Sequence, residues 1–157
     1  MKAVALLFLL ALLPPPALAD AASEDVPMYA VSLVGSPYLF GGTKPGSGLD
    51  CSGFVDLVFK QAAGVTLPRD SLAISEATRP VEQAALRPGD LVFFNTLRRS
   101  FSHVGIYLGD DRFVHATSSR TGSVMISSLH ERYWHDRYDG ARRVLPSDNH
   151  PDEAPSY

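Results

Sequence analysis

The chain has 157 residues, of which 45% are hydrophobic and 20% charged, a composition typical of one globular domain with an apolar core. The formal net charge is −3 at pH 7, which argues against a nucleic-acid partner because such proteins need a basic face. The single cysteine excludes a disulfide within the chain.

Residues 1–19 have the pattern of a cleavable signal peptide. Lys2 precedes an apolar run over 3–13, three prolines and the small-residue step Ala17-Leu18-Ala19. The run is too short to span a bilayer and the prolines interrupt it, although an uncleaved anchor is the alternative. We therefore expect an exported protein, periplasmic or secreted, that has no stable membrane insertion after cleavage. Cleavage after Ala19 would leave 13 basic and 17 acidic residues, a net charge of −4.

The segment after the signal peptide predicts a first helix, which Ser23 can cap and Gly35 can end. A loop dense in glycine, proline and serine follows it. Over 51–63 apolar residues recur at helical spacing, with Asp50 at the N-cap position and Gly64 as the stop. A weaker helix is expected over 71–78.

The second half of the chain has the period of strands. A Pro-Gly-Asp turn precedes an apolar strand over 91–94, and residues 103–116 alternate on both sides of a Gly-Asp-Asp turn, which indicates a hairpin. The segments 122–129 and 139–145 indicate two further strands. Helices followed by an antiparallel sheet predict an α+β domain.

Cys51 is predicted at the first turn of the helix over 51–63. Backbone N–H groups and the helix dipole at this position favour a thiolate, so we expect the pKa of the thiol to be lowered. The same N–H groups can donate to an oxyanion that develops on a substrate carbonyl. A structural cysteine is the alternative. However, an unpaired thiol in an exported protein is at risk of oxidation, and a functional role would explain why the protein keeps one.

A nucleophilic cysteine needs a base, and the hairpin supplies two histidines. With a three-residue loop over 109–111, His115 faces Gly105 and lies on the same face as His103. A loop of two or four residues without a bulge would put the rings on opposite faces. His103 can then accept the thiol proton while His115 orients the His103 ring. No role is assigned to the other histidines: His130, His135 and His150.

A metal site formed by Cys51, His103 and His115 is a further alternative, because zinc accepts these ligands. Structural zinc sites usually contain close-spaced ligand pairs such as CxxC, and the sequence has none. We therefore expect neither a metal nor another cofactor.

Four motifs in order, "GSPYLFGG", "LDCSGFV", "LRPGDLVFF" and "SHVGIYLGDDRFVHA", resemble the NlpC/P60 family of cell-wall cysteine peptidases. The likeness runs from about Val31 to Leu145. It implies a papain-like α+β fold, in which the cysteine-bearing helix packs on an antiparallel sheet. It also implies hydrolysis of peptidoglycan stem peptides, typically at the bond between D-γ-glutamate and diaminopimelate or lysine. In this resemblance Cys51 is the nucleophile, His103 the base and His115 the orienting residue.

The resemblance further suggests five substrate-binding residues. Tyr38 would assist the oxyanion or the substrate, and Asp50, Ser52, Asp70 and Ser71 would lie near the stem peptide. Each has a simpler reading: loop packing for Tyr38, helix caps for Asp50 and Ser71, a first-turn position for Ser52 and a turn for Asp70.

Two positions depart from the family pattern. Phe40 stands where tryptophan is frequent, which leaves the shape of one pocket wall open. Ile74 stands where glutamine is frequent, so a substrate contact could be lost.

The predicted organisation is a signal peptide over 1–19, a catalytic domain over 24–145 and a disordered polar tail over 146–157. The sequence contains no recognisable wall-binding module, so targeting would come from this domain or from a partner. A monomer is expected. The competing functions are a same-fold amidase or lipid acyl hydrolase, and a non-catalytic cell-wall-binding protein.

Overall fold

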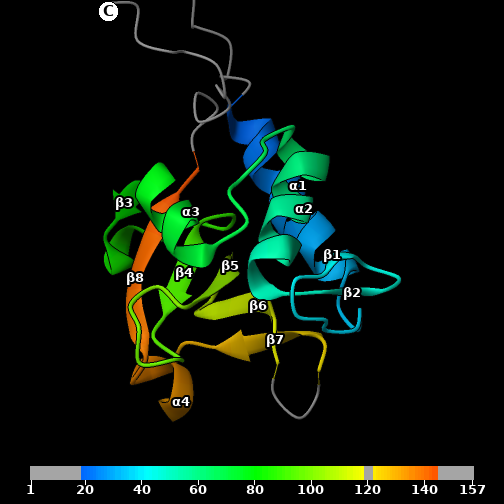
Figure 1. Cartoon of the computed structure of the whole chain (residues 1–157). Coiled ribbons are helices and arrows are strands. Elements are labelled where there is room, and N and C mark those ends of the chain that lie inside the picture. Colours follow the sequence, from blue (N-terminus) through cyan, green and yellow to red (C-terminus); the bar gives the residue numbers. More distant parts are fainter. Residues whose placement is uncertain (1–18, 119–121, 145–157) are drawn as a thin grey trace, which may run out of the picture.

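The computed structural model describes residues 19–118 and 122–144, which form helices packed on an antiparallel sheet (Figure 1). The helices α1 (Ala19–Ser32) and α2 (Cys51–Ala63) pack on each other, and both contact β5 (His103–Gly109). This arrangement confirms the α+β class and the cysteine-bearing helix on the sheet. The predicted tail and all but the last residue of the predicted signal peptide lie outside the described residues.

The main sheet is antiparallel throughout and has six strands in the order β3-β8-β4-β5-β6-β7. Its β4 strand covers the residues that the sequence predicts. A separate two-stranded ribbon, β1 with β2, lies in the loop before α2. The remaining elements are β1 (Thr43–Lys44), β2 (Gly48–Leu49), α3 (Ser71–Ala77), β3 (Arg79–Val81), η1 (Gln83–Ala85), β4 (Leu91–Phe94), β6 (Arg112–Ala116), β7 (Val124–Ser128), α4 (Arg132–His135) and β8 (Tyr138–Arg143).

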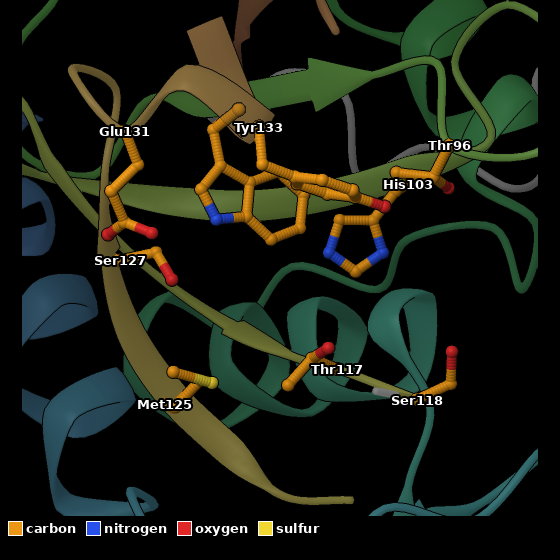
Figure 2. Close-up of a pocket in the computed structure, with 9 residues that line it drawn as sticks. Thr96, His103, Thr117, Ser118, Met125, Ser127, Glu131 and Tyr133 are labelled. Atoms are coloured by element: carbon orange, nitrogen blue, oxygen red, sulfur yellow. The ribbon is translucent and has the colours of Figure 1, made fainter. Parts of the chain in front are cut away.

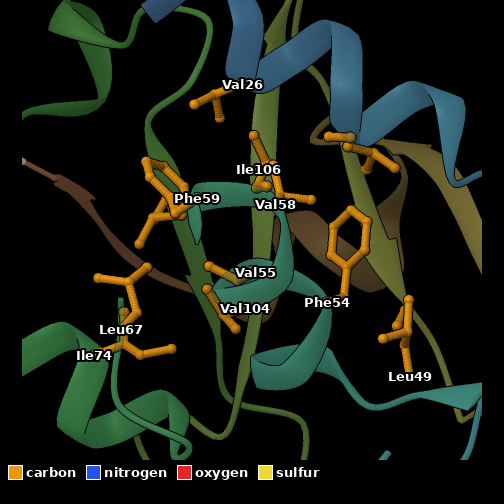
Figure 3. Packing of buried hydrophobic residues seen from close by; sticks show 14 of the residues in the cluster. Val26, Leu49, Phe54, Val55, Val58, Phe59, Leu67, Ile74, Val104 and Ile106 are labelled. Carbon is orange, nitrogen blue, oxygen red and sulfur yellow. The ribbon is translucent and has the colours of Figure 1, made fainter. Parts of the chain in front are cut away.

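Helix α2 has the bounds and both caps that the sequence predicts. The Asp50 side chain accepts the N–H of Gly53 at 2.6 Å, and Gly64 ends the helix in the left-handed region with φ 68°. The apolar face of α2 is buried against α1 and the sheet (Figure 3). Burial of such side chains contributes about 1.5–3 kcal/mol each, which holds the N-terminus of α2 in a fixed place. The fully buried members of this face are Phe54, Val55 and Val58.

The bounds of α1 differ from the prediction. The helix begins at Ala19, so Ser23 is not its N-cap, and it ends at Ser32 rather than at Gly35. A turn follows, in which Gly35 adopts φ 91° and donates its N–H to the carbonyl of Val124 at 2.9 Å. Gly35 therefore connects the end of α1 to β7 instead of capping the helix.

The β5–β6 hairpin reaches the predicted register through a different turn. Gly109 pairs with Arg112, so the loop has two residues rather than three. These are Asp110 and Asp111, whose φ angles of 50° and 55° are those of a type I′ turn. The ladder shifts by one residue between Tyr107 and Gly109. This bulge restores the alternation that a two-residue loop alone would reverse, so the two histidines still share a face.

A close backbone approach fixes the first turn of α2. An added Cβ on Gly53 would overlap the carbonyl oxygen of Gly42, and it would lie 2.9 Å from Oδ1 of Asp50. The Gly42 oxygen belongs to the backbone, so it can yield only if the loop moves, and the other close atoms lie in the Asp50 and Arg69 side chains, which bond each other. By contrast, a Cβ on Gly46 would meet no atom within 4 Å.

We predict that Gly53→Ala lowers the free energy of unfolding by about 1–3 kcal/mol, because the new methyl group must push the loop away from α2. The matched control Gly46→Ala should change it by no more than about 0.5 kcal/mol. Urea unfolding followed by circular dichroism measures both values. Equal effects of the two substitutions would contradict the close approach.

Candidate active site

Cys51 is the first residue of α2, and its side chain is partly exposed. Backbone N–H groups of Val104, Ser52 and Cys51 itself donate to its sulfur. Because Val104 directly follows His103 on β5, the sulfur lies against the start of that strand. The pairing of Cys51 with His103 as nucleophile and base stays a prediction, supported by the place of the sulfur beside this strand.

The pKa of Cys51 is opposite to the expectation. Burial and, to a lesser extent, the neighbouring Asp50 carboxylate raise the pKa of the thiol to about 11, although three backbone N–H groups act to lower it. The N-terminus of α2 thus stabilises the thiolate less than burial destabilises it. Without a ligand the thiol is neutral at pH 7.

The two hairpin histidines contact each other as predicted. Nε2 of His103 lies 2.8 Å from Nδ1 of His115 in a hydrogen bond between buried side chains. Gly105 leaves the room for this contact, because a Cβ there would lie 3.1 Å from Cβ of His115. Burial lowers the pKa of His103 to about 4, and burial together with the neighbouring His103 lowers the pKa of His115 to about 2. Both rings are therefore neutral at pH 7.

Two residues that the sequence analysis missed complete this cluster. The Trp134 ring stacks on His103 with a centroid distance of 5.4 Å and meets His115 edge-on at 4.7 Å. The Ser127 hydroxyl lies 3.1 Å from Nε2 of His115. Trp134 is the only tryptophan of the chain, which was a signal in the sequence, whereas nothing distinguished Ser127 from the other serines.

A cavity of about 360 Å³ opens beside His103 (Figure 2). Figure 2 shows Glu131 and Ser127 on one side of this view and His103 with Thr96 on the other. Glu131 is the only carboxylate among the lining residues, and its Oε1 accepts the N–H of Ser128 at 2.8 Å. The remaining walls are Thr117, Ser118, Met125, Tyr133 and Trp134.

Tyr38 lies near the thiol. Burial raises its pKa, as do the charges of Cys51 and Asp50 to a lesser extent, while a hydrogen bond with Ser118 acts in the opposite direction. Its segment is attached on two sides, since Tyr38 bridges to Leu49 and Pro37 bridges to Ser123. The structure therefore brings Tyr38 to the site, with its hydroxyl directed at Ser118.

The Asp50 and Ser52 side chains are engaged within the protein. Asp50 caps α2, accepts the N–H of Gly41 at 2.9 Å and forms an ion pair with Arg69 at 3.2 Å. The buried Ser52 hydroxyl donates to the carbonyl of Arg69 at 2.9 Å. These bonds join the loop before α2 to the segment before α3, and they account for both residues without a substrate. Contact of these two side chains with a stem peptide stays a prediction.

Asp70 and Ser71 begin helix α3. Asp70 accepts the N–H groups of Leu72 and Ala73 at 3.0 and 3.2 Å, so Asp70 rather than Ser71 is the cap. The buried Ser71 hydroxyl donates to the carbonyl of Phe101 at 2.6 Å, just before His103. Their contact with substrate also stays a prediction.

The two departures from the family pattern lie in different surroundings. Phe40 is 89% exposed, so it closes no pocket wall against the protein. Ile74 is fully buried in the core with Phe59 and Leu67, which explains an apolar residue there and removes it from any substrate surface.

The described residues give no support to the metal alternative. Within 19–118 and 122–144 no three histidine, cysteine, aspartate or glutamate side chains are grouped to hold a metal ion. The facing nitrogens of His103 and His115 bond each other instead. Over the same ranges no helix has the length and apolarity needed to cross a membrane.

The fold and the site define a class of α+β domains with a cysteine at a helix N-terminus and a histidine pair on the antiparallel sheet that this helix covers. The chain belongs to the NlpC/P60 family, whose model matches residues 35–143.

Among curated proteins, the chain is 43% identical over 141 residues to the gamma-DL-glutamyl hydrolase of Bacillus subtilis, covering 83% of this chain and 33% of the relative. It is also 43% identical over 126 residues to the murein DD-endopeptidase MepS/murein LD-carboxypeptidase of Escherichia coli, covering 80% and 64%. The chain thus spans about one third of the length of the Bacillus relative and just under two thirds of the length of the Escherichia relative.

Solved structures agree with the family. An NlpC/P60 family protein from Bacillus cereus superposes with a TM-score of 0.72 at 36% identity, covering 85% of this chain and 42% of that protein. The peptidoglycan hydrolase RipB from Mycobacterium tuberculosis superposes with a TM-score of 0.69 at 31% identity, covering 84% and 69%.

The buried histidines predict a loss of stability in mild acid. Their pKa values in the fold, about 4 and 2, lie below the unfolded value of 6.5, so only the unfolded chain takes up protons as the pH falls from 6.5 to 5. We expect the free energy of unfolding to fall by up to about 3 kcal/mol over this interval.

Urea unfolding at pH 6.5 and pH 5 measures this loss. His115→Gln removes one of the two titrations, so the variant should lose about half as much over the same interval, whatever its stability at pH 6.5. If parent and variant lost the same amount, the protonation of buried His115 would not be its cause.

Proposed function

We propose that the protein is an exported thiol hydrolase that cleaves peptidoglycan stem peptides. The observation that carries this proposal is the Cys51 thiol at the start of α2, which lies against the backbone of Val104 on β5, one residue after a histidine that bonds a second histidine. Family membership and the names of the relatives support the substrate class.

In the proposed mechanism, Cys51 is the nucleophile and His103 the base. Nε2 of His103 is engaged by His115, which leaves Nδ1 as the ring nitrogen that takes the thiol proton. Because the thiol is neutral at rest, this proton moves as the sulfur attacks the carbonyl. His103 then protonates the leaving amine, and water hydrolyses the acyl-enzyme.

The N-terminus of α2 supplies the charge stabilisation in this mechanism. The N–H groups of Cys51 and Ser52 already point to the sulfur, so an oxyanion formed beside it lies within their reach. Tyr38 is proposed to assist, since its hydroxyl is held at the same site by Ser118. Asp50, Ser52, Asp70 and Ser71 are proposed to line the stem-peptide side, where Arg69 also lies.

The bond that we propose joins D-γ-glutamate to diaminopimelate or lysine. Both of these residues carry a side-chain amine, and the cavity beside His103 has one carboxylate, Glu131. A group that leaves next to His103 can extend through this cavity toward Glu131 (Figure 2). The name of the Bacillus relative, a gamma-DL-glutamyl hydrolase, supports the same bond.

A second candidate is the D-alanyl cross-link between two stem peptides. It is favoured by the Escherichia relative named a murein DD-endopeptidase, whose identity to this chain is the same 43%. Both reactions use the same nucleophile and base, so the difference lies in what binds around the scissile carbonyl.

We further propose export by cleavage after Ala19, with residues 24–145 as the catalytic domain and 146–157 as a tail. The extracytoplasmic place of peptidoglycan supports the export, as does the signal-peptide pattern of 1–19. The domain is proposed to act as a monomer, with any cell-wall targeting supplied by a partner.

We predict that Cys51→Ala and His103→Gln each lower kcat on stem peptides at least about 1,000-fold, because each removes a participant in acyl transfer. The matched control His130→Gln should retain activity, since His130 is exposed and lies 2.9 Å from Asp111 at the opposite end of the hairpin. Release of product from a synthetic stem peptide, followed by mass spectrometry, measures the rates.

The same spectra identify the bond. Cleavage after γ-glutamate yields a new amine on diaminopimelate or lysine, whereas cleavage of a cross-link yields a new D-alanine carboxylate. Opening of cross-links alone would replace the proposed bond with the second candidate. Undiminished activity of Cys51→Ala would overturn the mechanism as a whole.

We predict that Glu131→Gln lowers kcat/KM about tenfold for substrates whose third residue carries a free amine, because a charge-assisted contact is lost. Glutamine keeps an oxygen for the Ser128 N–H, so the loop should persist. A substrate with the side-chain amine acetylated is the control, and parent and variant should cleave it equally. An equal loss on both substrates would show that Glu131 does not bind the side-chain amine.

A further inference from the structure

Ser127 ends a chain of buried contacts that begins at the base. Nε2 of His103 meets Nδ1 of His115 at 2.8 Å, and Nε2 of His115 meets the Ser127 hydroxyl oxygen at 3.1 Å. His115 is fully buried and Ser127 is 5% exposed. Ser127 lies on β7, opposite Phe113 of β6, so two different strands hold the two ends of this contact.

The protonation of these rings is linked. To accept the thiol proton at Nδ1, a neutral His103 must carry its hydrogen on Nε2 and donate it to Nδ1 of His115. His115 then carries its own hydrogen on Nε2, and this N–H must be accepted by the Ser127 oxygen. The opposite arrangement places a hydrogen on Nδ1 of His103, where the base cannot act.

Because His115 is buried, its tautomer depends on whether the Ser127 oxygen can accept a hydrogen bond from it. The low pKa of His115 keeps the ring neutral, so it has one N–H and one bare nitrogen rather than two donors. Without the Ser127 oxygen, the Nε2 hydrogen of a fully buried ring would lose its acceptor, a cost of about 1–3 kcal/mol. That cost favours the tautomer in which the hydrogen moves to Nδ1 and faces His103.

We propose that Ser127 is a positioning residue, whose oxygen accepts the Nε2 hydrogen of His115 and thereby permits the active tautomer of His103. This inference rests on the proposed function for its consequence in catalysis, but the tautomers themselves do not depend on the substrate. Ser127 also lines the cavity beside His103, and its proposed effect on the base passes through His115.

The test compares Ser127→Ala with Ser127→Thr, which keeps a hydroxyl, and with Ser128→Ala on the same strand. The Ser128 hydroxyl accepts the N–H of His130 and does not take part in the histidine contact. For Ser127→Ala we expect kcat to fall about 10- to 100-fold with KM within twofold, because the base is present in the wrong form. Ser127→Thr should restore most of kcat, and Ser128→Ala should retain it.

Nitrogen-15 NMR of labelled histidines reports the tautomers directly. The parent protein should show His103 and His115 both protonated on Nε2, and Ser127→Ala should shift both toward Nδ1. Unchanged tautomers in Ser127→Ala, or an unchanged kcat beside changed tautomers, would overturn the proposal. If the parent protein cleaves no stem peptide, the proposed function fails, while the NMR comparison still decides the role of Ser127.

Discussion

The geometry of the site depends on the carboxylate of Asp50. One of its oxygens accepts the N–H of Gly53 and caps α2, and the other accepts the N–H of Gly41 and the guanidinium of Arg69. A single side chain therefore joins the loop before α2, the helix itself and the segment before α3. Cys51 is the next residue, so the bonds of the Asp50 carboxylate also fix the position of the Cys51 backbone.

The Cys51 thiol and the paired rings of His103 and His115 are all uncharged at pH 7. Burial raises the pKa of Cys51 and lowers those of His103 and His115, so these three side chains do not form an ion pair with one another. A neutral thiol is also a poor target for oxidants, which attack the thiolate. The same burial would thus protect the single cysteine of the chain from oxidation.

Local patterns predicted the elements that carry the chemistry. The caps and apolar spacing of α2 and the apolar run of β4 are local signals, and the structure has both elements at the predicted residues. The register of His103 against His115 was also right, although through a turn and a bulge that together replaced the expected loop. The raised pKa of Cys51 and the contact of Ser127 were not predictable, because both arise from burial between elements distant in sequence.

Trp134 stacks on His103, touches His115 and lines the cavity beside them, and it is the only tryptophan of the chain. All indole fluorescence of the protein therefore originates beside the paired histidines. Occupation of the cavity or protonation of the stacked ring changes the surroundings of that one chromophore. The molecule thus carries an intrinsic optical reporter of its own site, and no label has to be introduced.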